Sequence, residues 1–176
     1  IGVLVRRGAD FATAEDAANA LAALEAAGVS GAELVEIDRS DCETQLKQLA
    51  DAKPDIFVVW GGDGTLRSAL TTVGKTTPNL LLLPGGTMNL LTRSIHGEKT
   101  WEQVLNGVLA APKRVTLPAG KVNSEFFYCA MLAGAPARFA EARESLRRGE
   151  LVKAASEAAA ALETLGTLHL DARYRD

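Results

Sequence analysis

The sequence has few cysteines, no long apolar run and no excess of basic residues. Its two cysteines, Cys42 and Cys129, have neither CxxC spacing nor a nearby histidine, which argues against a zinc site and a disulfide framework. No apolar run approaches the roughly 20 residues of a membrane-spanning helix. The net charge of -3 gives no basic field of the kind that holds nucleic-acid phosphates. We therefore expect a cytoplasmic protein that does not bind nucleic acid.

The composition is that of an ordinary globular protein, with 47% apolar and 23% charged residues. A length of 176 residues suffices for one sizeable domain, or for one domain and part of a second.

The first part of the chain alternates strand-like and helix-like segments, which predicts an α/β domain with a parallel sheet over residues 1–112. The expected strands are residues 1–5, 33–37, 56–60 and 80–83. Capping boxes predict helix starts at Thr13 with Asp16, at Ser40 with Glu43 and at Thr100 with Gln103. Residues 56–60 are apolar on both faces, as in a central parallel strand.

From residue 113 onward the pattern becomes strand-like and then helical. Strands are expected at residues 114–117, 120–123, 125–132 and 168–173, and helical sequence at 138–165. We expect residues 113–176 to be the start of a β-sandwich domain that is incomplete, because so few strands cannot close a sheet.

A first glycine-rich turn follows the strand at 56–60. Gly61, Gly62 and Gly64 free the backbone to point N–H groups at an anion, and Thr65 stands at the start of the next helix. A carboxylate beside phosphates is unfavourable unless it binds a metal or takes a proton from a hydroxyl. Asp63 is therefore the candidate catalytic residue and the candidate metal ligand. The alternative is that Asp63 only caps the helix that follows it.

A second glycine-rich turn follows the strand at 80–83. Gly85 and Gly86 again free the backbone, and Thr87 is expected to cap a helix that begins near residue 88. The Asn89 amide can hydrogen-bond a base, a ribose or a phosphate. A purely structural turn is the alternative. Because both turns follow strands of one parallel sheet, we expect them at the same edge, where such sheets bind ligands.

The two motifs together, Gly-Gly-Asp-Gly-Thr at 61–65 and Pro-Gly-Gly-Thr-Met-Asn at 84–89, resemble the catalytic domain of diacylglycerol kinases and their sphingosine, ceramide and bacterial lipid kinase relatives. The first motif is shared with NAD kinases and, more loosely, with phosphofructokinases. The second is more specific to the lipid kinases. The resemblance covers roughly residues 1–132 and implies ATP bound in a cleft between an α/β domain and a β-sandwich domain.

The resemblance also implies roles for individual residues. The glycine-rich nucleotide-binding motif of the family maps onto residues 61–65, which makes Thr65 a candidate nucleotide contact, and Asp63 matches the family's essential acid. Its second nucleotide-contacting turn is matched by Gly85, Gly86, Thr87 and Asn89. Family members carry an Asn-Pro and a Ser-Gly pair after the first strand, where this chain has Val-Arg-Arg-Gly-Ala-Asp at 5–10. We expect Arg6 or Arg7 to bind phosphate in their place, with Arg6 as our candidate; the alternative is that this corner of the site is altered. The family also has an acidic motif near the end of its second domain, with no counterpart before residue 176. The sequence therefore leaves open whether residues further on complete the active site.

We therefore predict a lipid kinase that uses Mg²⁺ and ATP and phosphorylates a lipid alcohol such as diacylglycerol, visiting a membrane surface transiently. The apolar residues 126–132 are expected to line either an acyl-chain cleft or a sandwich core. An NAD kinase-like enzyme and a non-catalytic nucleotide-binding regulatory module are the alternatives. The sequence leaves open whether the chain forms a homodimer.

Overall fold

The computed structural model describes residues 2–6, 13–37, 40–76, 79–131 and 135–164. They form two compact units, residues 1–129 and 130–176. The elements of the first unit are β1 (Gly2–Arg6), α1 (Ala14–Ala26), β2 (Glu33–Glu36), α2 (Cys42–Asp51), β3 (Ile56–Gly61), α3 (Asp63–Val73), β4 (Leu80–Pro84), α4 (Leu90–His96), α5 (Trp101–Ala110), β5 (Gly120–Val122) and β6 (Glu125–Phe127). The second unit contains α6 (Ala135–Arg147) and α7 (Leu151–Thr164).

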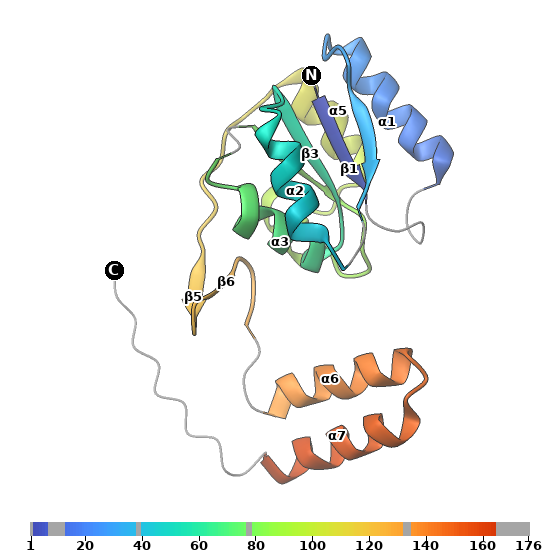
Figure 1. Ribbon diagram of the computed structural model, residues 1–176, viewed down its shortest axis with the longest axis vertical. Helices are drawn as coiled ribbons and strands as arrows, with labels where there is room; N and C mark the ends of the chain where they lie inside the picture. The colour runs from blue at the N-terminus through green and yellow to red at the C-terminus, as the bar shows by residue number, and fades with distance from the viewer. Residues whose placement is uncertain (1, 7–12, 38–39, 77–78, 132–134, 165–176) are drawn as a thin grey trace. The chain divides into compact units, whose positions relative to one another are not determined.

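A parallel sheet with strand order β2-β1-β3-β4 forms the centre of the first unit (Figure 1). The chain first moves from β1 to β2 and then returns to the other side of β1 to form β3. Open sheets of this kind bind ligands where the direction of winding changes, here between the carboxyl ends of β1 and β3. The predicted α/β class is confirmed.

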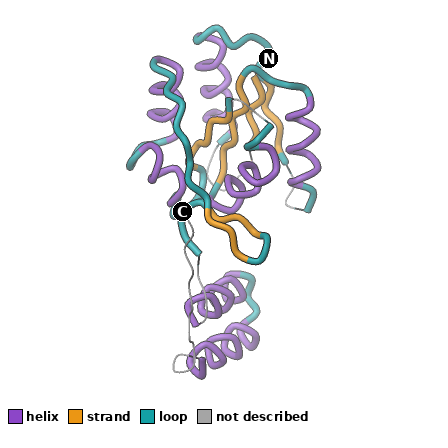
Figure 2. Tube along the Cα trace, turned by 90° about the vertical axis from the view of Figure 1, so that its left-hand side faces the viewer, coloured by secondary structure: helices purple, strands orange, loops and turns teal. Residues whose placement is uncertain are grey.

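Helices cover both faces of this sheet (Figure 2). On one face, Phe57 and Val59 of β3 pack in a core with residues of α2, α3 and α4. On the other face, Val58 and Trp60 pack with residues of α1 and α5. All four side chains are at most 1% exposed. This alternation confirms the prediction of a central strand that is apolar on both sides.

Two of the three expected capping boxes are confirmed. Thr13 with Asp16 opens α1, and Thr100 with Gln103 opens α5, each with both reciprocal hydrogen bonds. The capping box expected at Ser40 is wrong, because α2 begins at Cys42 and Asp41 occupies the N-cap position.

Beyond α5 the described residues contain less strand than expected. Residues 112–119 form no regular element, so the strand predicted at 114–117 is wrong, and the next two strands shorten to the antiparallel pair β5–β6. This ladder belongs to the first compact unit, and Gly149 separates the helical sequence into α6 and α7. The strand expected at 168–173 lies outside the described residues. The β-sandwich and a domain boundary at residue 112 stay predictions.

Candidate active site

The two glycine-rich turns lie side by side at the carboxyl edge of the sheet. Gly61 at the end of β3 is paired in register with Pro84 at the end of β4, and the Gly85 N–H donates to the Gly61 carbonyl at 3.0 Å. The prediction that the two motifs share one edge of one parallel sheet is confirmed. Arg6 ends β1 at the same edge, in register with Trp60. The Arg6 side chain lies outside the described residues, so its contact with phosphate stays a prediction.

Gly85 and Gly86 are required by the packing of one turn against the other. A Cβ atom at Gly86 would lie 2.6 Å from the Gly62 Cα. A Cβ atom at Gly85 would lie 3.0 Å from the Gly61 Cα and 2.8 Å from the Trp60 ring. Real Cβ atoms do not approach other atoms so closely, so any side chain here would push the turns apart.

The glycines of the first turn differ from one another in how closely they are packed. A Cβ atom at Gly61 would lie 2.8 Å from the Thr65 Cβ, and the Thr65 side chain is only 4% exposed. Thr65 therefore packs beneath the turn, and its predicted contact with the nucleotide is untested. Gly64 differs from these closely packed glycines, because a Cβ atom there would meet nothing within 4 Å. The packing of the protein itself does not require a glycine at position 64, and the space beside it is open.

The N-terminus of α3 opens at this turn. Gly62 is the N-cap residue, with extended backbone angles (φ -78°, ψ 172°) and no side chain to accept from the helix. The first intrahelical bond runs from the Leu66 N–H to the Gly62 carbonyl. The N–H groups of the first turn have no intrahelical acceptor, and the helix dipole adds a partial positive charge beside them. The end of α3 thus has the chemistry of an anion-binding site.

Asp63 connects the first turn to the start of α4, the helix that directly follows the second turn. Its Oδ2 accepts from the Leu90 N–H at 3.1 Å and its Oδ1 from the Leu91 N–H at 2.9 Å. These N–H groups belong to the first turn of α4. The alternative that Asp63 caps the helix that follows it is therefore wrong, because its carboxylate caps the next helix along the chain. A carboxylate oxygen has two acceptor sites, so each Asp63 oxygen keeps one for a metal ion or a proton.

Asn89 holds the second turn in shape. The Gly86 N–H donates to Asn89 Oδ1 at 2.8 Å, and Asn89 Nδ2 donates to the Gly86 carbonyl at 2.7 Å. The Asn89 backbone is left-handed, with φ 51°, a conformation that asparagine tolerates better than most residues. One Nδ2 hydrogen remains for a ligand.

The predicted capping role of Thr87 is wrong. Helix α4 begins at Leu90, with Asn89 at the N-cap position, and the Thr87 side chain is exposed. Contact between Thr87 and the nucleotide stays a prediction.

Two residues that are not among the predicted site residues also shape the site. Trp60 lies beneath Gly85, and its indole Nε1–H donates to the Pro84 carbonyl at 3.0 Å, which ties the end of β3 to that of β4. Arg67 projects from α3 to the β5–β6 ladder, where it bonds to the Phe126 carbonyl at 2.8 Å and to the Glu125 carboxylate. Trp60 could have been suspected from its place next to the motif. No sequence signal identified the partner of Arg67, which is 58 residues away.

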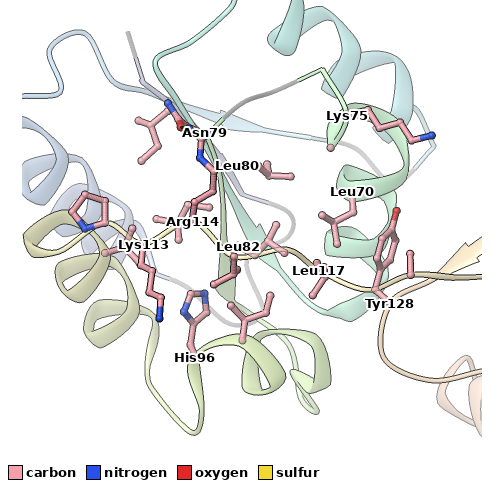
Figure 3. A pocket seen from close by; sticks show the side chains of 18 of the residues that line it. Leu70, Lys75, Asn79, Leu80, Leu82, His96, Lys113, Arg114, Leu117 and Tyr128 are labelled. Carbon is pink, nitrogen blue, oxygen red and sulfur yellow. Dashed lines mark hydrogen bonds between the residues drawn. The ribbon is translucent and has the colours of Figure 1, made fainter. Parts of the chain in front are cut away.

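A cavity of about 930 Å³ lies along the carboxyl-terminal halves of α3 and α4. In Figure 3, Leu70 of α3, Leu82 of β4 and Leu117 surround it. Phe126 and Tyr128 also line it, whereas the choice between an acyl-chain cleft and a sandwich core for residues 126–132 stays open. Leucine and aromatic side chains therefore form part of its lining.

Cationic residues border this cavity. Lys75, Lys113 and Arg114 are among its lining residues, and the Arg114 guanidinium donates to Asn79 Oδ1 at 3.1 Å. Burial lowers the pKa of His96, and the nearby Lys99 charge lowers it further, against the opposing effect of a hydrogen bond to the Leu82 backbone. The lowered pKa means that the neutral form of the His96 imidazole is favoured more than it would be in solvent.

No group of three or more His, Cys, Asp or Glu side chains in the described part of the chain is arranged to hold a metal ion. A divalent cation at Asp63 would need its other ligands from phosphate oxygens and water, which is the usual manner of Mg²⁺ binding. Among the described residues, no helix is both long and apolar enough to cross a membrane.

Known proteins share both the sequence pattern and the fold. Residues 7–117 match the diacylglycerol kinase catalytic domain family. Two structures from Bacillus anthracis str. Sterne, one a candidate diacylglycerol kinase and one described as a diacylglycerol kinase, align with TM-scores of 0.59 and 0.58 at 20% identity. Each alignment covers 72% of this chain but only 46% and 45% of the respective structures, so the chain spans less than half their length. The family consists of lipid kinases that use ATP, and this chain belongs to the diacylglycerol kinase catalytic domain family.

Proposed function

We propose that this chain binds ATP with Mg²⁺ at the two glycine-rich turns and, with the rest of its active site, transfers the γ-phosphate to a lipid hydroxyl. The observation that carries the proposal is the position of Asp63. Its carboxylate joins the first turn to the start of α4, next to the N-terminus of α3 and the open space at Gly64.

The phosphates are proposed to bind at the amino end of α3. The N–H groups of its first turn supply donors and the helix dipole supplies positive charge. The absence of a Gly64 side chain lets phosphate oxygens approach this backbone closely. The second turn acts mainly by fixing the first, through the contact of Gly86 with Gly62 and the hydrogen bonds of Asn89.

Asp63 is proposed to act either as the base that accepts the proton of the attacking hydroxyl or as the acid that holds the metal. Its hydrogen bonds to α4 fix the direction of the carboxylate and leave one acceptor site on each oxygen. Bound Mg²⁺ would neutralise the charge that develops on the phosphate oxygens. In phosphoryl transfer, positioning and charge neutralisation supply most of the rate enhancement.

The apolar side chains that line part of the cavity support a lipid as the acceptor. Helix α3 begins at Asp63 and reaches the cavity at Leu70, seven residues or about 10 Å further along the helix. Helix α4 begins at the Asp63 carboxylate and reaches the cavity at Ile95 and His96. A hydroxyl near Asp63 would thus lie within one acyl-chain length of this cavity.

The direct test is transfer of labelled phosphate from ATP with Mg²⁺, using diacylglycerol and related lipid alcohols in detergent micelles and NAD as competing acceptors. We expect label in a lipid and none in NAD. Label in NAD with every lipid refused would favour an NAD kinase-like enzyme. ATP binding without transfer to any acceptor, by a protein that includes the complete second domain, would favour a regulatory module.

The cavity has its own test within this assay. Leu70→Gln places a polar group on the cavity wall and should raise KM for long-chain acceptors more than for short-chain ones, with KM for ATP unchanged. Equal effects on both chain lengths would remove the cavity from the acceptor site.

A further inference from the structure

The helical hairpin of α6 and α7 has its small residues inside and its large aliphatic residues outside. Ala142, Ser145, Ala154 and Ala161 are buried where the two helices meet, and the Ser145 hydroxyl donates to Glu157 of the opposite helix at 2.7 Å. The exposed fractions of the large aliphatic residues are 56% for Leu146, 66% for Leu151, 87% for Val152 and 60% for Leu162. A hairpin stabilised only by its own contacts would place such residues between the helices.

Three of these four exposed residues gather at the tip of the hairpin, which has an ordered turn. The Gly149 N–H donates to the Leu146 carbonyl at 3.0 Å, and the Glu150 N–H donates to the Ser145 carbonyl at 2.9 Å. With Gly149 at φ 78°, this is the hydrogen-bond pattern of a Schellman turn. The tip therefore presents Leu146, Leu151 and Val152 on a defined backbone.

The tip carries an excess of positive charge. Residues 143–153 contain four basic residues and two acidic ones, which leaves a net charge of +2 in a chain whose net charge is -3. Arg148 and Lys153 both pair with Glu150, at 3.6 Å and 3.5 Å, so a single carboxylate serves two cations. Along the sequence, the basic residues therefore stand on both sides of the exposed aliphatic residues.

We propose that this tip docks into the surface of an anionic membrane, with Leu146, Leu151 and Val152 entering the interfacial layer and the flanking Arg and Lys side chains contacting lipid phosphates. Long cationic side chains can keep their charges at the headgroups while neighbouring apolar residues go deeper. The proposal rests on the proposed function, because a lipid acceptor brings the protein to a membrane.

The arrangement at the tip favours a lipid surface over a protein groove. Leu151 and Val152 are adjacent in the first turn of α7 and so point about 100° apart. A helix face that fits a protein groove uses residues three or four positions apart, on one side of the helix. Insertion of a helix end into a fluid layer buries neighbouring residues in several directions at once.

Vesicle co-sedimentation without ATP tests the proposal, using phosphatidylcholine vesicles with and without phosphatidylglycerol. We expect binding to the anionic vesicles that weakens as salt is added. The double variant Leu151→Asp with Val152→Asp should lower partitioning at least about 10-fold, since it removes two aliphatic side chains and adds negative charge. Leu162→Asp, near the other end of α7 and similarly exposed, is the matched control and should bind as the unmodified chain does.

Several results would overturn the proposal. Unchanged vesicle binding of the double variant would remove the tip from the interface, and an equal loss in Leu162→Asp would assign binding to a whole helix face. A lowered melting temperature or a changed oligomeric state in the double variant would show that protein covers the tip. Lipid phosphorylation in micelles without vesicle binding would refute only the docking proposal. Vesicle binding by a protein that phosphorylates no lipid would refute only the proposed function.

Discussion

The two glycine-rich turns have similar sequences but different relations to the rest of the protein. In the second turn, Gly85 and Gly86 fit closely against the first turn, and the Asn89 side chain bonds back to Gly86. In the first turn, Gly64 faces open space, and the N-terminus of α3 has no side-chain cap from Gly62.

This difference separates two reasons for a glycine near a phosphate site. A glycine that touches other backbone is needed for packing, and its replacement disturbs the fold first and the ligand second. A glycine that faces open space is available to the ligand, and its replacement should leave the fold intact. The following predictions test this division, beginning with the residue that joins the first turn to the start of α4.

Asp63→Asn should have the largest effect, lowering kcat by about 100-fold or more because the amide neither takes up a proton nor carries charge toward a metal. It should also cost about 1 kcal/mol of folding free energy, since one acceptor and a negative charge are lost at the N-terminus of α4. Steady-state kinetics and urea unfolding on the same preparation measure both effects.

The matched control for this variant is Asp16→Asn in the capping box of α1. It should lose a similar amount of stability while kcat stays unchanged, because it lies in a different helix and outside both turns. If Asp63→Asn kept normal turnover, Asp63 would be a structural cap only.

Gly64→Ala and Gly86→Ala should separate ligand space from packing. At Gly64 a methyl group meets no protein atom, so the melting temperature should hold or rise while the Kd for ATP rises at least about 10-fold. At Gly86 the methyl group would lie 2.6 Å from the Gly62 Cα, so we expect a loss of about 1 to 3 kcal/mol of stability with weaker ATP binding as its consequence.

Calorimetric titration with ATP and Mg²⁺ and thermal melting measure these two variants. Normal ATP binding by Gly64→Ala would show that the ligand does not use the space at Gly64. Full stability of Gly86→Ala would show that packing does not require a glycine at position 86.

Asn89→Ala should destabilise the protein by about 2 kcal/mol, because it removes two hydrogen bonds and leaves a left-handed residue that alanine tolerates poorly. Asn89→Gly loses the same hydrogen bonds but adopts this backbone without strain, so it should cost less, by about 0.5 to 1 kcal/mol. Urea midpoints give the difference. Equal losses in the two variants would show that backbone strain contributes nothing here.

Arg67→Ala should have the smallest effect, at most about 1 kcal/mol, because the Arg67 and Glu125 side chains are 47% and 74% exposed. The expected change is local: faster amide exchange in β5 and β6, which Arg67 ties to α3. Hydrogen-exchange mass spectrometry measures it, with Lys121→Ala on β5 as the control. A global loss of protection would instead make this contact part of the cooperative core.

Local signals in the sequence predicted much of the fold. The capping boxes at Thr13 and Thr100 are confirmed because their bonds span only three residues and depend on little else. The box at Ser40 has the same spacing, but the N-cap of the helix lies one residue later, at Asp41. The start of α4 could not be predicted locally, because the acceptor for its N–H groups is Asp63, 27 and 28 residues earlier.

The sequence by itself determined the α/β class, the central strand and the meeting of both motifs at one edge, because hydrophobic periodicity and glycine-rich turns after strands are properties of short segments. Only the tertiary structure decided which glycines serve packing, which helix Asp63 caps and where Arg67 finds its partner. Each of these three features depends on contacts between residues that are far apart in the sequence. The spacing of residues along the chain does not reveal which distant residues come into contact.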